Sequence, residues 1–159
     1  MPSKQQSIVL GGLVVGLLST SYLGLINMLC CAGVLAGSIV AVWHYTTTHE
    51  LTVSAGEGAT MGALAALMGA AIAMVLNFAL IKAGIRSDLV FNEFILNRFG
   101  DSMAPEQYDA MVEAMEADIT IGKYLLSGLF GLAVSAVFGA IGGAIGATIF
   151  KKGTEEVTA

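Results

Sequence analysis

The sequence predicts an all-α integral membrane bundle, because three observations indicate helices that lie in lipid. The chain has 159 residues, of which 56% are hydrophobic and 12% are charged, about half the charged fraction of an ordinary soluble domain. Its mean hydropathy is +0.81. Three apolar runs, Ile8 to Trp43, Ala59 to Ile81 and Tyr124 to Phe150, each exceed the length of about 18 residues that indicates a membrane span.

The first apolar run is too long for one span. As a straight helix its 36 residues would measure about 54 Å, whereas the hydrocarbon layer is about 30 Å thick. The polar stretch STSYLGLIN is the expected break, which gives a short or re-entrant helix over 8–22 and a span over 25–45. No small-x-small cleavage site follows the first apolar stretch, so we expect the N-terminus to be retained rather than removed as a signal peptide.

The third span is expected over 55–82, because Ser54 and Glu57 have the spacing of a capping box. In that arrangement the serine oxygen caps one free helix amide and the glutamate reaches back to another. The last span is expected over 119–150, with Lys151 and Lys152 at its membrane boundary. We therefore expect about four spans in a single membrane domain, residues 1–159; the charges leave the orientation open.

Residues 83–118 form the expected extramembrane segment, with amphipathic helices lying at the interface. One face of its second helix is apolar, and acidic side chains occupy the opposite face at Glu106, Asp109, Glu113 and Glu116. Anionic lipid headgroups would repel that face. A water-facing surface is the preferred interpretation, and docking of a soluble partner is the alternative.

Small residues recur at intervals of three and four along every expected span, which favours close helix packing inside lipid. A stripe of this kind on each span predicts a compact bundle. The predicted packing residues are Gly12, Gly16, Cys30, Gly33, Gly37, Gly58, Gly62, Gly69, Gly128, Gly131, Ser135, Gly139, Gly142 and Gly146.

The adjacent cysteines Cys30 and Cys31 are interpreted as packing residues rather than as a redox or zinc site. Neighbouring residues on a helix point about 100° apart, and the sequence has no CxxC spacing. Asn27 and Asn77 also lie inside expected spans, where a buried amide needs hydrogen-bond partners. A structural junction is the preferred interpretation of both, and a solute path is the alternative.

The sequence argues against several classes of function. It lacks a nucleophile–base arrangement, a metal-ligand spacing and a phosphate-binding loop, so we expect no catalysis, no cofactor and no metal. It also lacks a Lys/Arg-rich patch, which argues against nucleic-acid binding. The expected partners are the lipid bilayer and either a second copy of the chain or other membrane subunits.

Two stretches, INMLCCAGVLAGSIVAVWHY and LTVSAGEGATMGALAALMGA, support a resemblance. They resemble small, glycine-rich prokaryotic membrane proteins of unknown function, in which an Asn/Cys-Cys segment opens one span and a Ser-x-Gly-acid-Gly segment opens the next. The resemblance covers roughly residues 8–80. It implies a multi-pass bundle in the prokaryotic cytoplasmic (inner) membrane, and it implies no activity.

The expected function is therefore that of a non-catalytic accessory or structural subunit of a membrane complex, or of a homo-oligomer. The alternative is a small channel or transporter module with a path near Asn27 and Asn77. These alternatives differ in whether the two asparagines face a common cavity or a dry interface.

Overall fold

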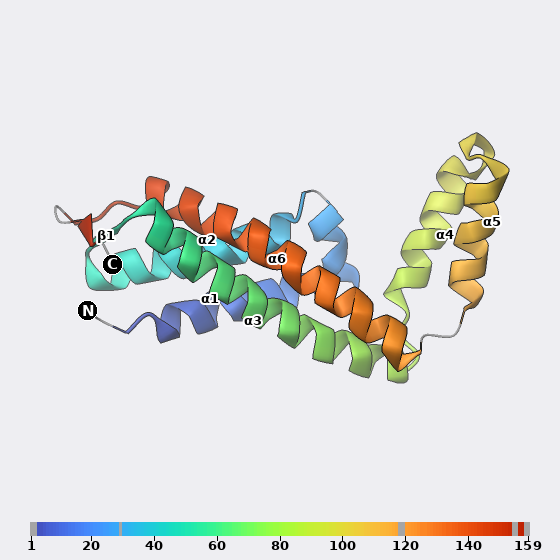
Figure 1. Ribbon diagram of the computed structural model, residues 1–159, viewed down its shortest axis with the longest axis horizontal. Coiled ribbons are helices and arrows are strands. Elements are labelled where there is room, and N and C mark those ends of the chain that lie inside the picture. The colour runs from blue at the N-terminus through green and yellow to red at the C-terminus, as the bar shows by residue number, and fades with distance from the viewer. Residues whose placement is uncertain (1–2, 29, 118–119, 154–155, 158–159) are drawn as a thin grey trace.

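The computed structural model describes residues 3–28, 30–117, 120–153 and 156–157 (Figure 1). The prediction of an all-α fold is confirmed, because six α-helices and two 3₁₀-helices make up most of the described chain. Two strands of two residues each, β1 (Thr52–Val53) and β2 (Glu156–Val157), pair in parallel near the end of the molecule where both termini lie.

Four helices form the bundle: α1 (Gln5–Leu18), α2 (Ala32–His49), α3 (Ala55–Lys82) and α6 (Ile121–Ile149). Helices α3 and α6 are the longest, run side by side, and form the most extensive helix pair. Helices α1 and α2 pack on this pair and on each other. The bundle therefore brings the first 82 residues together with the last helix.

The remaining helices, α4 (Ser87–Phe99) and α5 (Pro105–Glu116), form a hairpin with the short 3₁₀-helix η2 (Gly100–Ser102) at its tip. The hairpin stands away from the end of the bundle where α3 ends and α6 begins (Figure 1). Its four predicted acidic side chains, Glu106, Asp109, Glu113 and Glu116, are all exposed.

Two of the bundle helices, α3 and α6, are long and apolar enough to cross a membrane, by length and composition. Helix α1 is apolar but has only 14 residues, or about 21 Å, and the last turns of α2 contain threonines and a histidine. Four spans therefore stay a prediction.

The break in the first apolar run begins at the predicted polar stretch but is longer than predicted, because the first helix ends before residue 22 and the second begins after residue 25. Helix α1 ends at Leu18, the 3₁₀-helix η1 covers Ser21–Met28, and α2 begins only at Ala32. Cys30 and Cys31 precede α2 and both have left-handed backbone, with φ of 52° and 56°. A right-handed helix cannot include such residues, so the prediction of a helix from residue 25 was wrong.

The core consists of two clusters along the bundle. Near the termini, the fully buried Tyr45 and Met61 pack with Val42, Val53 and Ala147. Further along, Val15, Val34 and Ala66 form a second cluster, with Cys31 packed against it. Most of the remaining apolar surface faces outward, and α6 buries residues only between Gly139 and Ala147.

Candidate functional site

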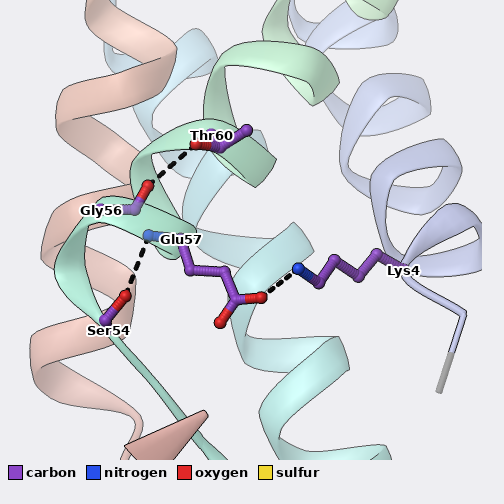
Figure 2. Close-up of polar contacts among 5 residues, drawn as sticks. All are labelled: Lys4, Ser54, Gly56, Glu57 and Thr60. Carbon is purple, nitrogen blue, oxygen red and sulfur yellow. Dashed lines mark hydrogen bonds and ion pairs between the residues drawn. The ribbon is translucent and has the colours of Figure 1, made fainter. Parts of the chain in front are cut away.

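The first turn of α3 holds a charged residue inside the bundle. Ser54 caps this helix, and its Oγ accepts a hydrogen bond from the Glu57 amide at 3.2 Å. The Glu57 carboxylate, however, pairs with the Lys4 ammonium at the start of α1 (Figure 2). The serine half of the predicted capping box is present, whereas the glutamate side chain turns to α1 because the α1–α3 contact places a cation beside it.

Glu57 is buried to an unusual degree for a carboxylate, with only 2% of its side chain exposed, compared with 30% for Lys4. One carboxylate oxygen meets Lys4. The other, Oε2, is buried and accepts no hydrogen bond from the described residues. Buried carboxylates are normally hydrogen-bonded throughout, so this oxygen needs a donor.

A pocket of about 360 Å³ adjoins this ion pair, and we call it the Glu57 pocket. The pocket lies between the first turns of α1 and α3, and both helices contribute polar and apolar side chains to its lining. The lining residues are Lys4, Ile8, Ser54, Gly56, Glu57, Thr60, Met61 and Leu64.

Other buried polar groups at this end of the bundle have partners. Ser7 Oγ and His44 Nδ1 share a hydrogen bond of 2.9 Å between α1 and α2. Ser38 donates to the Gly62 carbonyl at 3.1 Å, which joins α2 to α3. Thr46 donates to the Val42 carbonyl within α2. These bonds tie the helices together and leave the free oxygen of Glu57 as the exception.

The second polar site joins the two predicted asparagines through Ser19, the residue after α1. Asn27 Nδ2 donates to Ser19 Oγ at 2.8 Å, and Asn77 Nδ2 donates to the Ser19 carbonyl at 3.2 Å. The amide oxygen of Asn77 accepts from the Ser21 amide at 2.9 Å, and that of Asn27 accepts from the Val34 amide at 3.1 Å. Both side chains therefore satisfy backbone groups that the break between α1 and α2 leaves free.

Asn27 and Asn77 also line a common pocket of about 390 Å³ that is largely open rather than enclosed, which we call the asparagine cavity. It lies between η1, α3 and the first half of α6. Its walls are mainly apolar, with polar groups from Ser19, Ser127, Ser135 and Tyr124. The Tyr124 hydroxyl donates to the Met74 carbonyl on α3. The two asparagines thus combine a structural junction with a position beside open space.

Most of the predicted small residues lie where two helices approach closely. A Cβ atom added to Gly58 would lie 2.6 Å from the Gly143 carbonyl oxygen, and one added to Gly142 would lie 2.9 Å from that of Leu35. Tight contacts of this kind with side-chain or backbone atoms of the same chain are present at Gly12, Gly16, Gly33, Gly37, Gly58, Gly62, Gly69, Gly128, Gly139, Gly142 and Gly146.

Three predicted packing residues, Cys30, Gly131 and Ser135, lie elsewhere. Cys30 is exposed, because it precedes α2 and does not continue the stripe of that helix. Gly131 is exposed, and an added Cβ atom would meet no described atom within 4 Å. Ser135 lines the asparagine cavity and is only partly buried. The stripe is therefore only partly covered in this half of α6: Gly128 contacts the Met74 side chain of α3, whereas Gly131 meets no described atom.

Sequence reasoning missed Lys4 and Ser19, each of which joins parts of the chain more than 50 residues apart. Lys4 lies just before the first apolar helix, a position that the sequence shows but does not connect to Glu57. Among the described residues, no three His, Cys, Asp or Glu side chains lie together as metal ligands. No protein-family model, curated protein or solved structure matches the chain.

Proposed function

We propose that this chain is a non-catalytic integral membrane protein that crosses the bilayer with α1, α2, α3 and α6. In this proposal it is a building block of a larger assembly, as an accessory or structural subunit or as a homo-oligomer. The large apolar side chains that face outward along α6, among them Leu126, Leu129 and Phe130 with 63–74% exposure, suit contact with lipid tails.

The observation that carries the assembly proposal is the open half of the α6 stripe. In the covered half, Gly139, Gly142 and Gly146 touch helices of the same chain. In the open half, Gly131 meets no described atom and Ser135 borders a cavity. Small residues favour association in lipid because they let helix backbones approach, so a helix of a second molecule would pack well here.

The test is the size of the protein after gentle solubilisation from its native membrane. We expect a discrete assembly on native gels, and we expect Gly131→Leu to release smaller species because the larger side chain blocks close approach. Ala133→Leu adds a bulky side chain to another exposed position of α6 and should leave the assembly unchanged. A strictly monomeric wild-type protein without a partner would contradict the proposal.

A second candidate function is a channel or transporter module, favoured by the asparagine cavity that Asn27 and Asn77 share. The purified protein in liposomes should then increase the flux of a small neutral solute. Ala70→Leu should reduce that flux, because Ala70 lines the cavity, whereas Ala71→Leu changes an exposed neighbour and should not. Flux equal to that of protein-free liposomes would exclude this function.

A further inference from the structure

The Glu57 pocket is lined by a residue with one buried polar atom, Glu57 Oε2, that no described group satisfies. The Glu57 carboxylate lies inside the bundle although a water-exposed position is available one residue earlier, at the exposed Gly56. Figure 2 shows a single contact from this carboxylate, to Lys4. Since desolvating a carboxylate is costly unless both oxygens have partners, the site has capacity for one more hydrogen-bond donor at Oε2.

The other side of the pocket favours an anion. Lys4 is partly exposed and its ammonium has more protons than its one contact uses. The N-terminus of α3, a helix of 28 residues, adds partial positive charge, and Gly56 in its first turn lines the pocket with an amide that no intrahelical bond uses. The pocket therefore places an acceptor for a proton donor next to groups that attract negative charge.

A ligand with a single charge fits this arrangement poorly. A simple cation would bind Glu57 but would be repelled by Lys4, and a simple anion would meet the opposite conflict. A group that carries both an N–H donor and an anion satisfies both sides. The pocket wall of Ile8, Met61 and Leu64 adds an apolar surface, and Leu64 is 47% exposed, so the apolar wall reaches the outer surface of the helices.

We propose that the Glu57 pocket binds the headgroup of a phospholipid that carries a primary ammonium, such as phosphatidylethanolamine. The ammonium donates to Glu57 Oε2, the phosphate lies near Lys4 and the N-terminus of α3, and an acyl chain follows Ile8 and Leu64. The lipid source rests on the proposed membrane location. A quaternary ammonium has no N–H group, so phosphatidylcholine lacks the donor that this site requires.

The test uses the full-length protein in mixed detergent micelles, with native mass spectrometry to count bound lipid. Phosphatidylethanolamine and phosphatidylcholine with identical acyl chains are compared at equal concentration. We expect the ethanolamine lipid to bind about tenfold more tightly, the ratio that one additional charge-assisted hydrogen bond typically gives. Equal binding of the two lipids would overturn the proposal.

Two variants test whether a preference for phosphatidylethanolamine over phosphatidylcholine arises in this pocket. Glu57→Gln keeps the side-chain volume and removes the charge. It should bring the ratio of the affinities for the ethanolamine and choline lipids close to one. Glu50→Gln changes an exposed glutamate in the segment that joins α2 to α3, and it should leave the ratio unchanged. An unchanged preference in Glu57→Gln, with circular dichroism and elution volume like those of the wild type, would overturn the proposal.

If Glu57→Gln does not fold, Lys4→Gln gives an independent measurement, because it leaves the carboxylate but removes the group that attracts phosphate. It should weaken binding of both lipids about fivefold, whereas Lys151→Gln, at an exposed lysine, should not. Unchanged lipid binding in Lys4→Gln would overturn the proposal.

Free phosphoethanolamine distinguishes a lipid from a soluble ligand with the same headgroup. Failure of millimolar phosphoethanolamine to displace the lipid would support the lipid source, and complete displacement at micromolar concentration would overturn it in favour of a soluble zwitterion. Each spectrum also reports the oligomeric state. A monomer with the expected lipid preference would contradict the assembly proposal alone, and an assembly without the preference would contradict the lipid proposal alone.

Discussion

The two halves of α6 have similar small-residue spacing but different surroundings. In the half that includes Gly142 and Gly146, helices α2 and α3 cover the small residues. In the half that includes Gly131, Gly128 contacts the Met74 side chain, but Gly131 meets no described atom and Ser135 borders a cavity. A stripe of small residues thus allows a helix to approach another closely, and the presence of a neighbouring helix decides whether that contact forms.

The two polar sites also lie at different halves of the bundle. The Glu57 pocket lies beside the covered half of the α3–α6 pair, where Gly58 touches Gly143, and the asparagine cavity borders the open half. The covered half is therefore expected to respond strongly to changes in volume. The open half is expected to tolerate them within one molecule.

The largest effect is expected from Gly143→Ala in the covered half. An added Cβ atom would overlap the Gly58 carbonyl oxygen and lie 2.9 Å from Gly62 Cα, and backbone atoms cannot move aside without separating α3 from α6. We expect a loss of about 2 to 3 kcal/mol in the free energy of unfolding, measured by denaturant titration in detergent micelles.

The control is Gly131→Ala in the open half of the same helix. Alanine is the better helix former by up to about 1 kcal/mol, and the new methyl group meets no described atom, so the free energy of unfolding should stay equal or rise. A loss in Gly131→Ala as large as that in Gly143→Ala would remove the distinction between the two halves.

An intermediate effect is expected from Asn77→Leu at the polar junction. The change removes the donor to the Ser19 carbonyl and the acceptor for the Ser21 amide, and unsatisfied buried groups typically cost about 1 to 2 kcal/mol. Thermal unfolding in micelles measures the loss. Asn97→Leu, at an exposed position of α4, should be nearly neutral; equal losses would show that the junction contributes little.

The smallest effect is expected from removing a helix cap. Ser54→Ala eliminates the bond from the Glu57 amide, and we expect a loss of about 1 kcal/mol because α3 is packed at this end. Thr120→Ala removes the corresponding bond that Thr120 Oγ1 accepts from the Lys123 amide at the open end of α6. There we expect faster amide hydrogen exchange in the first turn of α6 and little change in the free energy of unfolding. A greater loss in the free energy of unfolding for Thr120→Ala than for Ser54→Ala would contradict this expectation.

The sequence by itself determined the helical class and the bounds of the clearest helix. Long apolar runs leave few polar side chains to compete with backbone hydrogen bonds, and the Ser54 cap placed the start of α3 at Ala55, as observed. The spacing of glycines also indicated which helix faces are small. Each of these properties depends on residues that lie near one another in the chain.

Only the tertiary structure decided which of those residues have partners. The pairing of Lys4 with Glu57 and the sharing of Ser19 by Asn27 and Asn77 join segments distant in sequence. The exposed position of Cys30 follows from two left-handed residues before α2. Local patterns encode propensity and spacing, whereas the partner of a side chain depends on how the helices pack, and the sequence pattern alone does not specify that arrangement.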